Sequence, residues 1–443
     1  MFEGWSIIAV ALGYVSALFA LAWIGDRKTR SRKGGGGRPL IYSLSIAVYC
    51  TSWTFFGSVG LAAATGYDFM PVYLGPIIMF TLGWPILLRV VRLAKSQNIT
   101  SVADFLAARY GKSPAVAAIV TIVAVIGVLP YIALQLKAIA VSIETLLGAS
   151  LLVSIEVPRV AFMDTAFVIT LTLATFAVLF GTRHIDATAH QDGLMMAIAA
   201  DSLVKLAAFI AVGLFVIFGM FGGVGDFVAQ ATRSPVVESV FGQNSNGGKW
   251  LTVTFLSFVC IILLPRQFHV TVVENNSEVE LRRAAWMFPA YLVLINLFVI
   301  PIAVAGLLTL PAGTTDPDFY VLKLPLSADA TTMSLIAFVG GLSAAAMVIV
   351  ESIALAIMVS NGLVIPLLLR HRLTDTVPQE DMGGLLLMIR RVAIFCILLL
   401  GYGVYQALGE SQGLAAIGLI SFAAIAQLAP AFFGGLVWRQ GTA

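Results

Sequence analysis

Charged side chains are scarce in this chain of 443 residues. Asp, Glu, Lys and Arg make up 11% of the sequence, whereas 59% of the residues are hydrophobic. The mean hydropathy is +0.97. A soluble protein of this length would carry far more charge on its surface. The composition therefore excludes an ordinary soluble protein and predicts an all-α membrane protein with many spans.

Cysteine and histidine are also rare. The three cysteines, Cys50, Cys260 and Cys396, all lie in apolar runs, and their odd number argues against a disulfide framework. The four histidines lack the spacing of a transition-metal site, so we expect none. The net charge is only +3 and the basic residues are spread over loops. We therefore expect no nucleic-acid partner.

Long hydrophobic runs are abundant, and they predict eleven membrane spans. The first run has no basic residue before it and no small-residue cleavage pattern after it, so it should remain in the mature protein. The predicted spans cover residues 7–24, 40–63, 70–93, 115–146, 163–181, 193–221, 250–274, 285–310, 331–368, 390–408 and 413–438.

The distribution of basic residues predicts the orientation of these spans. With the N-terminus outside, twenty of the 26 Lys and Arg residues, Arg266 among them, fall in segments on the cytoplasmic side, and only four fall in outer loops. Cytoplasmic loops are enriched in Lys and Arg, so this is the favoured orientation, with the C-terminus cytoplasmic. The basic segment 26–33 and the glycines 34–37 are predicted to form a flexible cytoplasmic loop at anionic lipid headgroups.

Two of the predicted spans are interrupted. Residues 49–60, with the sequence YCTSWTFFGSVG, combine hydroxyl and aromatic side chains with Gly57 and Gly60. The apolar run 255–264 is interrupted by Pro265, Arg266 and Gln267. Irregular backbone at membrane depth is tolerated only where it is buried in protein or lines a wet cavity. Paired interruptions in two halves of a chain predict a transporter binding site.

The order of the spans predicts two repeats. If residues 1–38 hold an extra helix and a basic loop, two sets of five spans remain, in residues 39–222 and 250–443, with a periplasmic loop at 223–249. Each set opens with an interrupted span, and an odd number of spans inverts the second copy. A short interfacial helix is also predicted within residues 98–111, from a capping pattern before an apolar period.

Several motifs resemble those of a known family. Residues 99–111, ITSVADFLAARYG, resemble the helix between spans in the sodium/solute symporter family, which has a LeuT-type 5+5 inverted-repeat fold. The 49–60 motif, residues 264–286 (LPRQFHVTVVENNSEVELRRAAW) and residues 358–370 (MVSNGLVIPLLLR) resemble the symporter-like membrane domain of bacterial sensor histidine kinases of the CbrA type.

This resemblance implies a multi-pass protein of the bacterial inner membrane that binds a small polar solute such as an amino acid. It also implies a cytoplasmic kinase module and a response regulator as partners, besides membrane lipid. No kinase motif occurs in residues 1–443, so we expect a transporter-like domain rather than an enzyme, and the N-terminal part of a longer protein.

The chain departs from the family pattern at the eighth core helix. Symporters of this family place sodium-binding hydroxyls there, but the nearest alignment puts Ala346, Ile349 and Val350 at these positions. A hard cation needs a cage of oxygen ligands, so we expect solute uptake to be largely independent of sodium. No cofactor is expected beyond a coupling ion, either H⁺ or Na⁺.

The candidate site residues lie on and near the two interrupted spans. The predicted solute-binding residues are Tyr49, Thr51, Ser52, Trp53, Gln135, Cys260 and Gln267. The predicted ion-coupling residues are Glu351 and Asp201. Trp53 could pack in the core, but its hydroxyl neighbours on a loosened helix favour a wall of the site. His269 and Glu274 are predicted to lie near the cytoplasmic mouth, as gate or interface residues.

The charged residues within spans each have two interpretations. Glu351 must face the bundle interior, where it either carries a coupling proton or pairs structurally with Lys137 or a hydroxyl. Asp201 and Lys205, four residues apart, favour a structural ion pair. Lys137 either extends toward the outer surface or reaches a substrate carboxylate.

Three functions fit these features. The leading hypothesis is transport of a small polar nutrient by alternating access, with sensing for an attached kinase. A receptor that binds solute without moving it is the alternative. An ion channel ranks last because the sequence has no carbonyl-filter motif or acidic pore ring.

Overall fold

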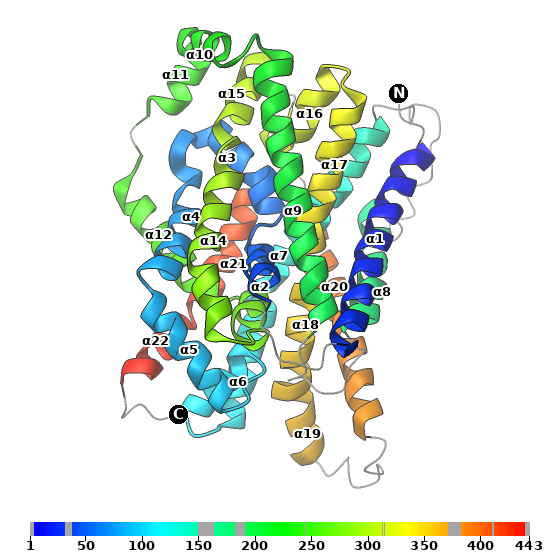
Figure 1. Ribbon diagram of the computed structural model, residues 1–443, viewed down its shortest axis with the longest axis vertical. Coiled ribbons are helices and arrows are strands. Elements are labelled where there is room, and N and C mark those ends of the chain that lie inside the picture. Colours follow the sequence, from blue (N-terminus) through cyan, green and yellow to red (C-terminus); the bar gives the residue numbers. More distant parts are fainter. Residues whose placement is uncertain are drawn as a thin grey trace.

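The computed structural model describes residues 4–31, 38–148, 164–181, 191–243, 245–311, 313, 315–370, 382–409 and 412–438. In these residues the chain forms helices and no strand (Figure 1). The predicted glycine linker and the residues after Trp438 lie outside the described part.

The first half of the chain contains an outlying helix followed by a broken one. Its elements are α1 (Gly4–Ser31), α2 (Pro39–Ser45), η1 (Ile46–Tyr49), η2 (Trp53–Gly57), α3 (Ser58–Thr65), η3 (Gly66–Phe69), α4 (Pro71–Thr81), α5 (Trp84–Ser96), α6 (Val102–Arg109), α7 (Pro114–Gly148), α8 (Thr165–Gly181), α9 (Asp192–Phe215) and η4 (Val216–Met220).

The second half again begins its membrane part with a broken helix. Its elements are α10 (Val224–Arg233), α11 (Pro235–Phe241), α12 (Gly247–Leu263), α13 (Pro265–Phe268), η5 (His269–Val273), α14 (Glu278–Asn296), α15 (Val299–Thr309), η6 (Pro317–Phe319), α16 (Tyr320–Ser327), α17 (Thr331–Ala346), α18 (Val348–Val359), η7 (Ser360–Val364), α19 (Ile365–Arg370), α20 (Met382–Leu408), α21 (Leu414–Ala426) and α22 (Ala429–Val437).

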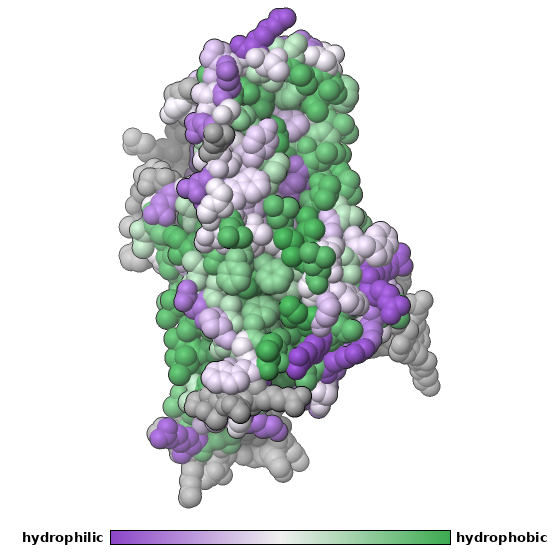
Figure 2. All heavy atoms as spheres, turned by 90° about the vertical axis from the view of Figure 1, so that its left-hand side faces the viewer, coloured by the Kyte–Doolittle hydropathy of each residue, from purple (hydrophilic) through white to green (hydrophobic). Residues whose placement is uncertain are grey.

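These helices account for the predicted spans. Seven helices of the described part are long and apolar enough to cross a membrane, and three bent pairs of helices also qualify. The shorter apolar helix α8 coincides with the remaining predicted span. Hydrophobic side chains cover much of the middle of the face shown in Figure 2, and strongly hydrophilic ones lie toward its top, toward its bottom and along its lower right side. This distribution is that of a multi-pass membrane protein.

Both predicted interruptions are present as sharp bends. Pro39–Tyr49 and Trp53–Phe69 meet at 65°, and Gly247–Leu263 and Pro265–Val273 meet at 54°. The second bend follows from Pro265, because the residue before a proline is driven out of the helical region; Leu264 has a ψ of 129°. At the first bend Cys50 is extended, with a ψ of 103°.

The glycines are not the cause of the first break, contrary to the sequence-based interpretation. The break lies at Cys50 and Thr51, whereas Gly57 and Gly60 lie in the helical turns that follow. Gly60 instead allows close approach, since a Cβ there would lie 1.8 Å from Oδ1 of Asp318. Glycine is used here because no larger residue fits between the helix and the loop.

Two further features differ from the prediction. The span predicted at 70–93 is a bent pair, in which Pro71–Thr81 and Trp84–Ser96 meet at 69°. The predicted loop at 223–249 contains the helices α10 and α11. The predicted short helix is confirmed as α6, where the Ser101 side chain accepts a hydrogen bond from the Asp104 N–H.

The outlying helix α1 packs along α9, on the opposite side of the bundle from α4, α5 and α12 (Figure 1). Extensive helix–helix contacts also join α12 to α4, α17 to α9 and α21 to α7. The segment η1, which precedes the first break, contacts α13 and η5, which follow the second. The two broken helices therefore meet in the interior of the bundle.

Candidate functional site

The first break is held by side chains of α7. The Thr51 Oγ1 lies 2.6 Å from the hydroxyl of Tyr131, and the Ser52 N–H donates to Gln135 Oε1 at 3.2 Å. All four residues are buried. The side-chain oxygen of Gln135 thus accepts a hydrogen bond from a backbone N–H at the break, in place of a helical carbonyl.

The second break contributes a basic residue and an amide. Gln267 Nε2 donates to the carbonyl of Ile46 at 3.5 Å, which bridges the two broken helices. The guanidinium carbon of Arg266 lies 4.2 Å from the ring centroid of Tyr131, in a cation–π arrangement. The side chains of Arg266 and Glu351, each 1% exposed, form a hydrogen-bonded ion pair.

A second buried charge pair lies on the other side of the first break. Lys205 is fully buried on α9, and its Nζ donates to the Cys50 carbonyl at 2.9 Å. The same ammonium lies 3.5 Å from Oδ2 of Asp201. The hydroxyl of Tyr14, on the outlying helix α1, donates to Asp201. The predicted i, i+4 ion pair is confirmed.

These contacts define one central polar cluster at the two breaks. Its members are Thr51, Ser52, Tyr131, Gln135, Lys205, Arg266, Gln267 and Glu351. Several of its buried atoms have no hydrogen-bond partner within the described part of the chain: Ser52 Oγ, Gln135 Nε2, Arg266 Nε and Nη2, Gln267 Oε1 and Glu351 Oε1. Buried polar atoms are almost always satisfied, so this cluster can accept water or the polar groups of a solute.

Three predicted site residues border the cluster with their polar atoms already engaged. The Tyr49 hydroxyl donates to the Val72 carbonyl at 2.8 Å. The Trp53 indole N–H donates to the Ala415 carbonyl at 3.1 Å. The Cys260 thiol donates to the Phe422 carbonyl at 3.2 Å. In this conformation they serve as packing around the site, whereas Thr51, Ser52, Gln135 and Gln267 lie within it.

The structure corrects two assignments of charge. Lys137 is not the partner of Glu351, because its Nζ donates to the Gln412 carbonyl at 2.6 Å. Arg266 does not belong to an inner loop, as its buried pair with Glu351 shows. Arg266 and Tyr131 are site residues that the sequence reasoning missed. A single arginine between a proline and a glutamine, inside an apolar run, was the available signal.

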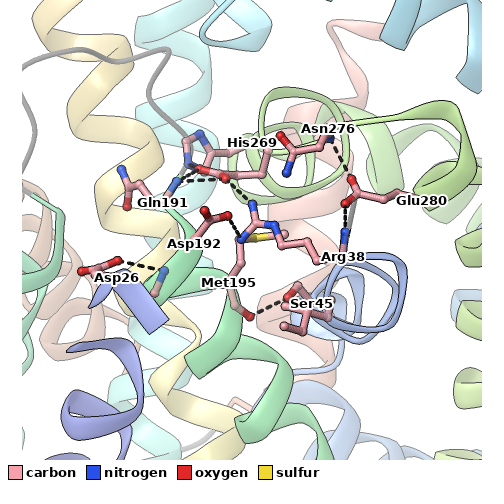
Figure 3. A network of polar contacts seen from close by, with 12 residues as sticks. Asp26, Arg38, Ser45, Gln191, Asp192, Met195, His269, Asn276 and Glu280 are labelled. Carbon is pink, nitrogen blue, oxygen red and sulfur yellow. Dashed lines mark hydrogen bonds and ion pairs between the residues drawn. The ribbon is translucent and has the colours of Figure 1, made fainter. Parts of the chain in front are cut away.

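A polar network closes the end of the bundle that is predicted to be cytoplasmic (Figure 3). Arg38, at the start of α2, lies 2.5 Å from Asp192 and 3.2 Å from Glu274. The Gln191 N–H donates to Glu274 at 3.1 Å, and His269 Nε2 lies 3.6 Å from the same carboxylate. The predicted gate residues thus join the broken helices to α9.

The same network continues onto α14 and α1. Glu280 accepts from the Arg38 N–H at 2.6 Å and from the Asn276 N–H at 2.7 Å. Asp26, near the end of α1, accepts from the Gly193 N–H at 2.9 Å. Five elements, α1, α2, α9, η5 and α14, are therefore tied together at this end.

A buried carboxylate, Asp318, lies at the opposite end. Asp318, in η6 between α15 and α16, is 4% exposed and accepts a hydrogen bond from the Leu414 N–H at 2.7 Å. It fits against Gly60, just beyond the first break. Burial raises the pKa of Asp318 to about 6. Polar contacts thus lie at both ends of the bundle, on either side of the central polar cluster in the sequence-predicted orientation.

Comparisons with known proteins agree with this architecture. Residues 36–213 match the model of the sodium:solute symporter family. A structure of a Na⁺-coupled sialic acid symporter in a substrate-bound outward-open state superposes with a TM-score of 0.69, at 14% identity, over 98% of this chain and 87% of that one. The chain has the LeuT-type fold. The predicted bundle of two inverted five-helix repeats, with an extra helix at the N-terminus, is confirmed.

One curated relative is an uncharacterized symporter, YhjB, of Bacillus subtilis (strain 168). It is 24% identical over 298 residues, which make up 66% of this chain and 56% of the relative. The chain thus spans little more than half the length of that relative.

Proposed function

We propose that this chain is a membrane domain that binds a small polar nutrient such as an amino acid and transports it by alternating access. The set of unpartnered atoms at the two helix breaks carries this proposal. Gln135 Nε2 and the Arg266 guanidinium supply free donors, and Gln267 Oε1 and Glu351 Oε1 supply free acceptors. An α-amino acid presents both a carboxylate and an ammonium group, so it can satisfy donors and acceptors together.

Transport is favoured over simple reception by the two polar closures. Alternating access requires a contact that opens on each side of the binding site in turn. Arg38 ties the predicted cytoplasmic end, and Asp318 seals the other. The contacts at both ends are made by charged or polar groups, so each can be exchanged for contacts with water. A receptor that binds without transport remains the alternative function.

Uptake of labelled amino acids into proteoliposomes separates these functions. We expect accumulation by the parent chain under a proton gradient. Gln135→Leu should weaken the apparent affinity by about 10- to 100-fold, because an unmet buried hydrogen bond costs about 1–3 kcal/mol. Gln427→Leu is the matched control, since this exposed amide only contacts the Ala423 carbonyl. Solute binding without uptake would favour the receptor, and neither binding nor uptake would refute both.

The motifs shared with sensor kinases extend the proposal to signalling. We propose that solute occupancy of this domain is passed to a cytoplasmic kinase module and a response regulator. The closure around Arg38 is suited to this role because it changes when the predicted cytoplasmic end opens. Autophosphorylation of the kinase module in the presence of this domain, with and without solute, tests this step. A rate that does not depend on solute would contradict it.

A further inference from the structure

The carbonyl of Cys50 is a main-chain acceptor at the first break. In transporters with broken helices, such carbonyls coordinate the coupling cation. Here the carbonyl accepts a hydrogen bond from the ammonium of Lys205 at 2.9 Å. A positive charge that belongs to the chain therefore already occupies a position where a free cation would be bound.

The ammonium is anchored from several elements. Asp201, one turn earlier on α9, lies 3.5 Å away and provides the countercharge. Tyr14 on α1 donates to the Asp201 side chain, and Ser343 Oγ on α17 donates to the Asp201 main-chain carbonyl at 2.8 Å. Lys205 itself is 0% exposed. The charge is thus built into the packing of three helices.

The second carboxylate of the region is also neutralised within the chain. Glu351 is paired with Arg266, whose side chain comes from the second break. Each of the two acidic side chains near the breaks therefore has its own cation. Both carboxylates are therefore paired within the chain and do not need a cation from solution.

The residues in the place of sodium-binding hydroxyls do not fit a sodium ion. Ala346, Ile349 and Val350, together with Asp201, line a small crevice of about 50 Å³ between α1, α8, α9, α17 and α18. None of these three side chains carries an oxygen atom. A hard cation requires a cage of oxygen ligands. The Cys50 carbonyl at the first break, which does not line this crevice, already accepts the hydrogen bond of Lys205.

We propose that the ammonium of Lys205 is the resident cation of this domain and takes the place of the sodium ion at the first break. Solute binding and transport then proceed without sodium. The consequence for transport rests on the proposed function, whereas the occupancy of the cation position does not. The two are tested by separate measurements.

The thermal stability of the purified protein tests the cation position without any solute. At equal ionic strength, the Tm of the parent chain should be the same in sodium chloride and in choline chloride. Lys205→Ala vacates the position, so sodium or methylammonium should raise its Tm by about 2 to 4 °C relative to choline, by binding the folded state. Lys137→Ala is the matched control, because that ammonium contacts a loop carbonyl outside the break, and it should show no such rise.

A saturable sodium-dependent rise in the Tm of the parent chain would overturn the proposal. The proposal is also overturned if neither sodium nor methylammonium raises the Tm of Lys205→Ala relative to choline. If Lys205→Ala does not fold, the parent chain in the two salts still decides the matter. Lys205→Arg, which keeps the charge, should then fold and behave like the parent.

Uptake in sodium-free proteoliposomes tests the consequence for transport. Accumulation by the parent chain without sodium supports the inference. A strict sodium requirement would overturn it and leave the proposed function standing. If no solute is taken up in any salt, the proposed function fails while the Tm comparison still decides the identity of the cation.

Discussion

The buried pair of Arg266 and Glu351 allows the sharpest perturbation of the central polar cluster. Glu351→Gln removes one charge and leaves Arg266 buried without its partner. Both side chains are 1% exposed, and breaking a pair at this depth costs about 3 to 5 kcal/mol. We expect the Tm of Glu351→Gln in detergent to fall by about 3 to 5 °C.

A double variant separates this structural effect from proton coupling. Arg266→Met with Glu351→Met replaces the pair by apolar side chains and should recover most of the lost stability. Glu278→Gln is the surface control, because its pair with Arg92 is 48% and 61% exposed, and its effect should stay below about 1 kcal/mol. If Glu351→Gln is as stable as the parent, binds solute and exchanges it but no longer accumulates it, the pair is not structural. Glu351 would then carry the coupling proton, as the sequence alone suggested.

Three further predictions concern the closures on either side of the cluster. Burial is the largest of the effects that together raise the pKa of Asp318 to about 6. The hydrogen bond from the Leu414 N–H and the charge of Lys137 oppose this rise, whereas the charge of Asp316 adds to it. The carboxyl therefore keeps its proton to a higher pH in the folded state than in the unfolded state. Its contribution to the free energy of unfolding is complete below about pH 4 and is lost as the pH rises through about 6. Asp318→Asn should flatten this part of the curve of Tm against pH. Arg38→Ala should open the predicted cytoplasmic end and speed thiol labelling of the buried Cys50 and Cys260 in a Cys396→Ser background, whereas Arg92→Ala should not; unchanged labelling would argue against a closure there. Gly60→Ala places a Cβ 1.8 Å from Asp318 and should destabilise the chain by about 1–3 kcal/mol, and a Tm equal to that of the parent would contradict the close packing.

Much of the fold could be predicted because lipid imposes a simple pattern on the sequence. Long apolar runs locate the spans, and Pro265 alone places the second break. The first break was located only approximately. Glycine signals either a bend or a close approach, and Gly60 serves the second purpose because Asp318 lies against it. That contact joins residues more than 250 positions apart and leaves no local trace.

The charge pairs show the same limit. The pair of Asp201 and Lys205 was predicted because spacing of four on one helix brings the side chains together. The pair of Arg266 and Glu351 was not, since its members come from different helices. Arg266 was assigned to an inner loop, so its pairing with Glu351 was not considered. A basic residue next to a helix break is equally suited to a buried site. Whether such a residue lies in a loop or in a buried ion pair is decided by tertiary packing rather than by local propensity.

Equilibrium binding of labelled amino acids to the purified chain tests the central claim most directly. We predict saturable binding of at least one amino acid in sodium-free buffer by the parent chain and by Gln427→Leu. Gln135→Leu should bind the same amino acid about 10- to 100-fold more weakly. Equal binding by all three proteins would show that the solute does not contact the helix breaks, and it would contradict this account.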